Sequence, residues 1–128
     1  DFAGFFDRYA SPPLMPPAWL FPVVWAVLYA LMGISAYLIY FSDGSADKKR
    51  ALWIYAAQLA VNFSWSIVFF KYEKLWAGAA VIILLIVLVM LMITAFKKIS
   101  PTAAWLNVPY LLWLIFAAYL NIATAVIN

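Results

Sequence analysis

Cysteine and histidine are both absent from the 128-residue sequence, and charged residues make up only 10% of it. Without these two residue types the chain has no disulfide, no imidazole general base, and no thiolate or imidazole ligand for zinc or haem iron. Hydrophobic residues make up 70% of the chain, whereas soluble domains contain about 45–50%. This composition indicates a membrane protein.

The few charges divide the chain into long uncharged segments, 9–42, 51–70, 75–96 and 99–128. Each segment can contain a helix of about 20 residues, the length that crosses a hydrocarbon core of about 30 Å. The run 81–93 does not alternate polar and apolar residues, as a strand of a membrane β-barrel would. We therefore predict an all-α integral membrane protein with four transmembrane helices in a single domain, 1–128. The expected helices cover about 18–41, 49–71, 74–96 and 101–126.

Prolines help to set the expected helix bounds. Four prolines in the segment 12–17 disfavour regular helix before residue 18, whereas Pro22 falls in the first turn of the first helix, where a missing N–H costs least. Ser100 is placed to cap the last helix, with Pro101 at its first position. Because the connections are short, helices that follow one another should be antiparallel neighbours.

The charges near the spans suggest how the chain is oriented in the membrane and which classes of partner it can bind. The loops 43–50 and 97–98 carry five basic residues, against three on the other side, which favours these two loops as the cytoplasmic ones. The net charge of +3 lies beside the spans, where it can interact with lipid headgroups. A lipid bilayer is therefore the expected partner, and nucleic acid is not.

Polar side chains within the spans are few, and three of them share one face of the second helix. Gln58, Asn62 and Trp65 lie at positions i, i+4 and i+7. Two interpretations remain open: hydrogen bonds between helices, or contact with a ligand. Taken alone, the pattern favours hydrogen bonds between helices.

The first and last helices carry similar faces. Tyr110, Trp113, Ala117 and Asn121 share a broad face of the last helix, and Trp25 lies on a stripe of the first. Antiparallel packing places most of these groups in the same half of the bilayer as Asn62 and Trp65. If the faces point inward, they form an aromatic cavity with two amides beneath the proline-rich segment. Such a cavity suits a flat apolar ligand with a few polar substituents.

Chemistry of other kinds is poorly supported. No Asp or Glu lies within a span, so the sequence has no proton relay or buried ion site of the kind that ion-driven transporters use. No base is available at depth to activate a serine or threonine.

Several ordered motifs together resemble the tryptophan-rich sensory protein family, also called the translocator protein family or peripheral benzodiazepine receptors. The resemblance covers essentially the whole chain. It rests on Pro16-Pro17-x-Trp19, Val24-Trp25, Leu28-Tyr29-x-x-Met32-Gly33, Gln58-Leu59-x-x-Asn62-x-x-Trp65, Phe69-Phe70, Trp76 and Pro109-Tyr110-x-x-Trp113-x-x-Phe116-Ala117-x-x-Leu120-Asn121.

This resemblance implies a five-helix bundle that binds porphyrins in a pocket covered by a loop. Here the lid loop would be about 1–17, and the family's first helix would lie upstream of Asp1. The expected ligand contacts are Trp19, Phe21, Trp25, Tyr29, Gln58, Asn62, Trp65, Trp76, Tyr110, Trp113, Ala117 and Asn121. Of these, Trp19 and Trp76 could instead belong to an interfacial aromatic belt.

The sequence also departs from the family pattern. Leu14 stands at a lid position where the family often has tryptophan. The final segment, 120–128, lacks the tyrosine and basic residue of the sterol-recognition pattern seen in animal members. Together with the short loops, this favours a bacterial or archaeal protein over a mitochondrial one, with a bacterial cell membrane as the expected location.

Three functions remain open. The first is a porphyrin-binding sensor or carrier, in which no cofactor is required and the porphyrin is the ligand. The second is an enzyme that breaks down porphyrin with light and oxygen, in which Trp25, Trp65 and Trp113 handle radicals and the porphyrin is the substrate. The third is a structural or partner-binding bundle. A homodimer is expected through the small residues Ala56, Ala57 and Ala60.

Overall fold

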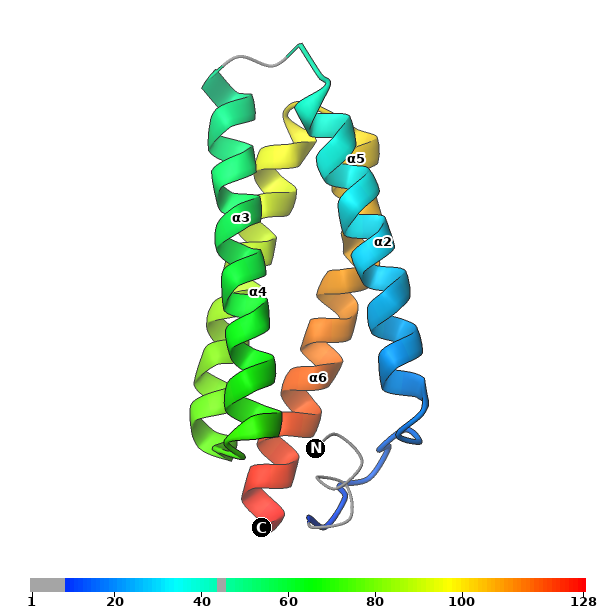
Figure 1. Cartoon of the computed structure of the whole chain (residues 1–128), viewed down its shortest axis with the longest axis vertical. Coiled ribbons are helices and arrows are strands. Elements are labelled where there is room, and N and C mark those ends of the chain that lie inside the picture. Colours follow the sequence, from blue (N-terminus) through cyan, green and yellow to red (C-terminus); the bar gives the residue numbers. More distant parts are fainter. Residues whose placement is uncertain (1–8, 44–45) are drawn as a thin grey trace.

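The computed structural model describes residues 9–43 and 46–128, so the first eight residues of the expected lid lie outside the described part. Figure 1 shows a helical bundle whose long helices run side by side. In chain order the elements are α2 (Leu20–Tyr40), α3 (Ala46–Ser66), the π-helix η1 (Ile67–Lys71), α4 (Leu75–Lys97), α5 (Pro101–Leu106) and α6 (Val108–Ile127).

Four helical stretches in the described residues are long and apolar enough to cross a membrane: Leu20–Tyr40, Ala46–Lys71, Leu75–Lys97 and Pro101–Ile127. The prediction of an all-α bundle with four spans is therefore confirmed. The connections between α2 and α3 and between α4 and α5 lie at one end of the bundle, and the C-terminus lies at the other (Figure 1).

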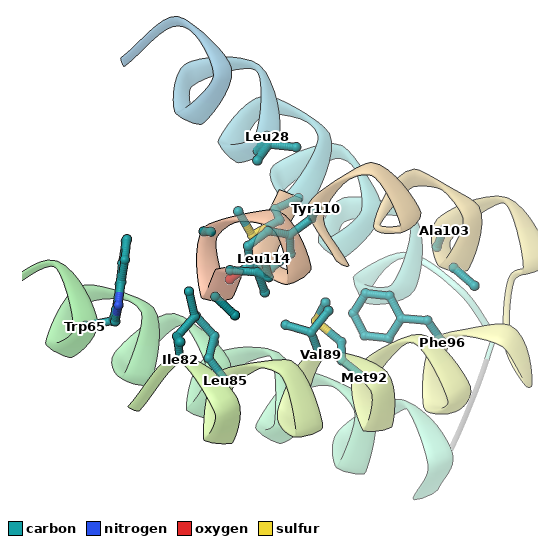
Figure 2. Packing of buried hydrophobic residues seen from close by; sticks show 14 of the residues in the cluster. Leu28, Trp65, Ile82, Leu85, Val89, Met92, Phe96, Ala103, Tyr110 and Leu114 are labelled. Atoms are coloured by element: carbon teal, nitrogen blue, oxygen red, sulfur yellow. The ribbon is translucent and has the colours of Figure 1, made fainter. Parts of the chain in front are cut away.

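The core forms around α4, which packs against α3, α5 and α6. Its buried side chains recur every three or four residues, as one face of a helix requires. Figure 2 shows this face of α4 directed toward Tyr110 and Leu114 of α6. The buried face consists of Gly78, Ala79, Ile82, Leu85, Val89, Met92 and Phe96.

The sequence predicts one continuous helix for the last span, but the structure has two. The span is interrupted at Asn107, between α5 and α6. Pro109 has no N–H and cannot donate the hydrogen bond that an unbroken helix would form at this position. The Asn107 Nδ2 atom instead bonds to Ser35 Oγ at 2.8 Å and to the Ala103 carbonyl at 3.1 Å. This amide thus ties the break to α2.

The ends of the helices follow local signals. Ser100 caps α5 by accepting a hydrogen bond from the Ala103 N–H at 3.2 Å, and Pro101 opens that helix, as predicted. Pro22 lies in the first turn of α2. The second span begins at Ala46, three residues before the expected start, and ends in the π-helix instead of regular α-helix.

The described part of the lid, residues 9–17, is bonded to the C-terminal half of α6 and to Asn128. The Tyr119 hydroxyl donates to the Pro13 carbonyl at 2.6 Å. Ala10 and Asn128 exchange two hydrogen bonds of 3.1 Å between the backbone of the first and the side-chain amide of the second. The lid is therefore held across the end of the bundle where α2 begins.

Candidate functional site

A chain of hydrogen bonds links three helices around the two buried amides of α3. The Tyr29 hydroxyl donates to Asn62 Oδ1 at 2.5 Å, and Asn62 Nδ2 donates to the Tyr110 hydroxyl at 2.8 Å. Tyr110 in turn donates to Gln58 Oε1 at 2.7 Å, and Gln58 Nε2 points at Met32 Sδ, 3.7 Å away. Both amides thus have partners in α2 and α6, as the hydrogen-bonding interpretation predicted.

A second polar link lies nearer the lid. Trp65 Nε1 donates to Asn121 Oδ1 at 2.9 Å, and Asn121 Nδ2 donates to the Leu75 carbonyl at 2.8 Å. This link joins α3, α6 and the start of α4. Gly78 leaves the necessary space, because a Cβ at that position would lie 3.0 Å from Asn121 Oδ1.

Trp25 stands at the centre of the aromatic side chains. Its ring centroid lies 5.6 Å from Tyr29, 6.2 Å from both Trp65 and Tyr110, and 6.5 Å from Trp113. These distances lie in the range of favourable aromatic pairs. Trp25 itself is only half-buried, so one side of the cluster is accessible from outside the bundle.

The space beneath the lid is nearly filled. Phe21 packs edge-on against Trp113 with centroids 5.6 Å apart. The remaining cavity, lined by Met15, Phe21, Trp65, Ala117 and other side chains, measures about 20 Å³. This volume is enough for one water molecule, which requires about 10–15 Å³. The open cavity that the sequence suggested beneath the proline-rich segment is thus closed by its own aromatic rings.

A larger space opens sideways, between α2 and α3. This groove is lined by Pro22, Trp25, Tyr29, Ser66 and Phe70 and has a volume of about 510 Å³. Sites for small molecules commonly measure about 300–1,000 Å³. We call it the α2–α3 groove.

The structure gathers ten of the twelve expected ligand contacts into this one region. They are connected by the hydrogen bonds, ring contacts and cavity lining described above. The ten residues are Phe21, Trp25, Tyr29, Gln58, Asn62, Trp65, Tyr110, Trp113, Ala117 and Asn121.

The other two residues lie apart from this region. Trp19 is 67% exposed at the start of α2, and Trp76 is 62% exposed in the first turn of α4. Both positions fit the alternative that the sequence left open, in which these rings belong to an aromatic belt at the membrane interface.

Some residues of the site were missing from the expected contacts. Phe70 lines the groove, and Phe69 stacks on Trp65 with centroids 5.3 Å apart. Their spacing after Trp65 was visible in the sequence. At the lid, Met15 faces the small cavity, whereas Leu14 is 79% exposed and adopts a φ of 69°. No pattern in the sequence distinguished these two neighbours.

One polar atom in the aromatic cluster is left without a partner. Trp113 Nε1 is buried and has no hydrogen-bond acceptor among the described residues. Buried donors of this kind are rare, because an unpaired N–H costs about 1–3 kcal/mol. The indole N–H is therefore available to a ligand that brings an acceptor.

Together the fold and the site define a multi-pass integral membrane bundle with an amide-linked aromatic core and an adjoining groove. The chain belongs to the TspO/MBR family, which it matches over residues 1–127.

Relatives come from bacteria, archaea and animals. A tryptophan-rich protein TspO of Chlorobaculum tepidum is 35% identical, over 97% of this chain and 79% of its own length. The translocator protein of Ovis aries is 42% identical, over 91% of this chain and 72% of its own. A tryptophan-rich sensory protein of Cereibacter sphaeroides is 36% identical, over 96% and 76%.

Proposed function

We propose that the protein is a membrane receptor or carrier for porphyrins and similar flat hydrophobic ligands, bound in the α2–α3 groove. The observation that carries this proposal is the aromatic lining of the groove. Trp25, Tyr29 and Phe70 border a space of about 510 Å³, and Trp65 and Trp113 stand directly behind Trp25.

The groove offers both stacking and polar contacts to a planar ring. Aromatic pairs contribute about 0.5–1.5 kcal/mol each beyond the apolar surface that they bury. Tyr29 supplies a hydroxyl at the edge of the groove, where Asn62 holds it in place. The free N–H of Trp113 can bind a carboxylate or carbonyl oxygen of the ligand once the rings move apart. Asn62 positions the Tyr29 hydroxyl, and Gln58 is linked to Asn62 through the Tyr110 hydroxyl.

Titration with protoporphyrin IX in darkness tests this proposal. Binding is followed by the absorption band of the porphyrin, so that replacing a tryptophan does not alter the signal itself. Trp25→Leu should weaken binding at least tenfold, because it removes the central ring of the site. Trp53→Leu is the matched control, since Trp53 is 68% exposed on α3 and should leave binding unchanged. Equal binding by wild type and both variants would reject the α2–α3 groove as the site.

A second function, the light-driven breakdown of porphyrin, is favoured because three tryptophan rings lie close together in space. Trp25 faces the groove, and its ring lies 6.2 Å from Trp65 and 6.5 Å from Trp113. Such a chain of indoles can exchange single electrons with a light-excited porphyrin. In this alternative the porphyrin absorbs the light and dioxygen is the oxidant. Both oxygen atoms add across one bridge of the macrocycle, so no external electron donor is needed.

Illumination of the bound porphyrin separates the two functions. A binder leaves the products of illumination the same with and without protein. An enzyme forms a product that requires the protein and that Trp113→Phe reduces, because phenylalanine fills the space but is far harder to oxidise. A product unaffected by replacing any of the three tryptophans would exclude their role as radical carriers.

We propose two further properties of the protein. A homodimer would form through α3, whose small residues Ala56, Ala57 and Ala60 are exposed on the outer face of that helix and permit close packing of two helices. We also propose a location in a bacterial cell membrane, supported by the short connections between helices and by a C-terminal segment without the sterol-recognition pattern.

A further inference from the structure

The two ends of the bundle differ in charge. The end with the α2–α3 and α4–α5 connections carries five basic residues and two acidic ones among the described residues. The basic residues are Lys48, Lys49, Arg50, Lys97 and Lys98, and the acidic ones are Asp43 and Asp47. At the opposite end, the described charges are Lys71, Glu73 and Lys74. The first end therefore presents the stronger positive potential to its side of the membrane.

A groove reaches the outer surface of the bundle at this basic end. It lies between the last turns of α4 and the break that separates α5 from α6, and it has a volume of about 220 Å³. Its lining is apolar except for one ammonium group and one indole: Ile93, Lys97, Ala104, Trp105 and Val108. Lys97 is the last residue of α4, and Trp105 is 69% exposed.

The groove combines features that recognise the two parts of a phospholipid. Its apolar floor lies on helices that span the membrane, so the neighbouring solvent there is hydrocarbon. An indole ring is amphipathic and favours the headgroup level, and a lysine at the end of a span extends its ammonium toward the same level. A zwitterionic headgroup would gain little from the surrounding excess of positive charge, whereas an anionic one is attracted by it.

We propose that this groove is a specific site for an anionic phospholipid. One acyl chain lies along Ile93, Ala104 and Val108, and the phosphate lies against the Lys97 ammonium and the Trp105 indole N–H. The site is lined by α4, α5 and α6 at the basic end, whereas the α2–α3 groove is lined by other helices nearer the opposite end, so the two sites share no residue.

Native mass spectrometry of the full chain in detergent tests this site. The probes are dioleoyl phosphatidylglycerol and dioleoyl phosphatidylcholine, which differ only in their headgroups. Wild type should bind the first lipid more tightly. Lys97→Gln should weaken its binding about fivefold, the factor that corresponds to about 1 kcal/mol for one basic residue near a membrane surface. Val108→Phe should weaken both lipids, because the larger ring occupies the floor of the groove.

Lys71→Gln is the matched control, because it removes the same charge from the opposite end of the bundle. It should leave the binding of the anionic lipid unchanged. Circular dichroism of each variant checks that the helices are intact. Equal affinity of wild type for the two lipids would overturn the proposal. Equal losses of affinity for the anionic lipid in Lys97→Gln and Lys71→Gln would also overturn it. Unaltered lipid binding by a folded Val108→Phe variant would do the same.

Discussion

Tyr110→Phe removes a single hydroxyl group from the centre of the bundle and keeps the ring. That hydroxyl accepts a hydrogen bond from Asn62 at 2.8 Å and donates one to Gln58 at 2.7 Å, and all three residues are fully buried. The variant therefore leaves one amide N–H and one amide oxygen without partners inside the membrane.

The expected loss of stability follows from these two bonds. Hydrogen bonds between membrane helices contribute about 0.6 kcal/mol on average and about 1.7 kcal/mol at most. Losing both should lower the free energy of unfolding by about 1–3 kcal/mol. Tyr110 also contacts Trp25 through its ring, and the phenylalanine preserves that contact.

Unfolding in mixed micelles with increasing sodium dodecyl sulfate measures this loss. Tyr37→Phe is the control: Tyr37 is 61% exposed, and its replacement should change stability by less than about 0.5 kcal/mol. A double-mutant cycle with Gln58→Leu should give a coupling energy of about 0.6–1.7 kcal/mol. Additive effects in this cycle, or a loss no larger than that of the control, would refute the proposed role of the network.

Three further predictions concern packing, the lid and assembly. Gly78→Ala should destabilise the protein by about 1–3 kcal/mol in thermal unfolding, because the added Cβ would lie 3.0 Å from Asn121 Oδ1. Gly33→Ala is the control: its added Cβ would have no atom within 4 Å, so the change should be neutral or stabilising. Tyr119→Phe removes the 2.6 Å bond to the lid and should speed amide hydrogen exchange in residues 9–17 about fivefold. Unchanged exchange would show that other contacts hold the lid. Ala60→Leu should reduce the fraction of dimer captured by chemical crosslinking, and an undiminished dimer would point to another interface.

The spans could be predicted from the sequence because their signal is local. Uncharged runs of sufficient length define membrane helices without knowledge of any partner. The cap at Ser100 likewise depends on neighbours in the chain. Pro109 is a local signal for the break at Asn107, but the bond that ties the Asn107 side-chain amide to Ser35 of α2 depends on a partner in another helix and could not be predicted from the sequence.

The sequence predicted most of the residues of the site but not the position of its open space. Helical spacing placed Gln58, Asn62 and Trp65 on one face, and all three are buried together. Whether the amides face a ligand or another helix depends on how α2 and α6 are rotated, which spacing within α3 does not determine. For the same reason, the sequence did not reveal that the open space lies beside Trp25 and not beneath the lid.

Filling the α2–α3 groove tests the central proposal most directly. Ser66 lines this groove and is half-buried, so Ser66→Phe adds a ring to the space without removing any aromatic contact. Ile67→Phe adds a ring at the next position, which is 48% exposed, and serves as the control. We predict that Ser66→Phe binds protoporphyrin IX at least tenfold more weakly in darkness while Ile67→Phe binds it as wild type does. Wild-type affinity in a folded Ser66→Phe variant would contradict the proposal that the ligand occupies this groove.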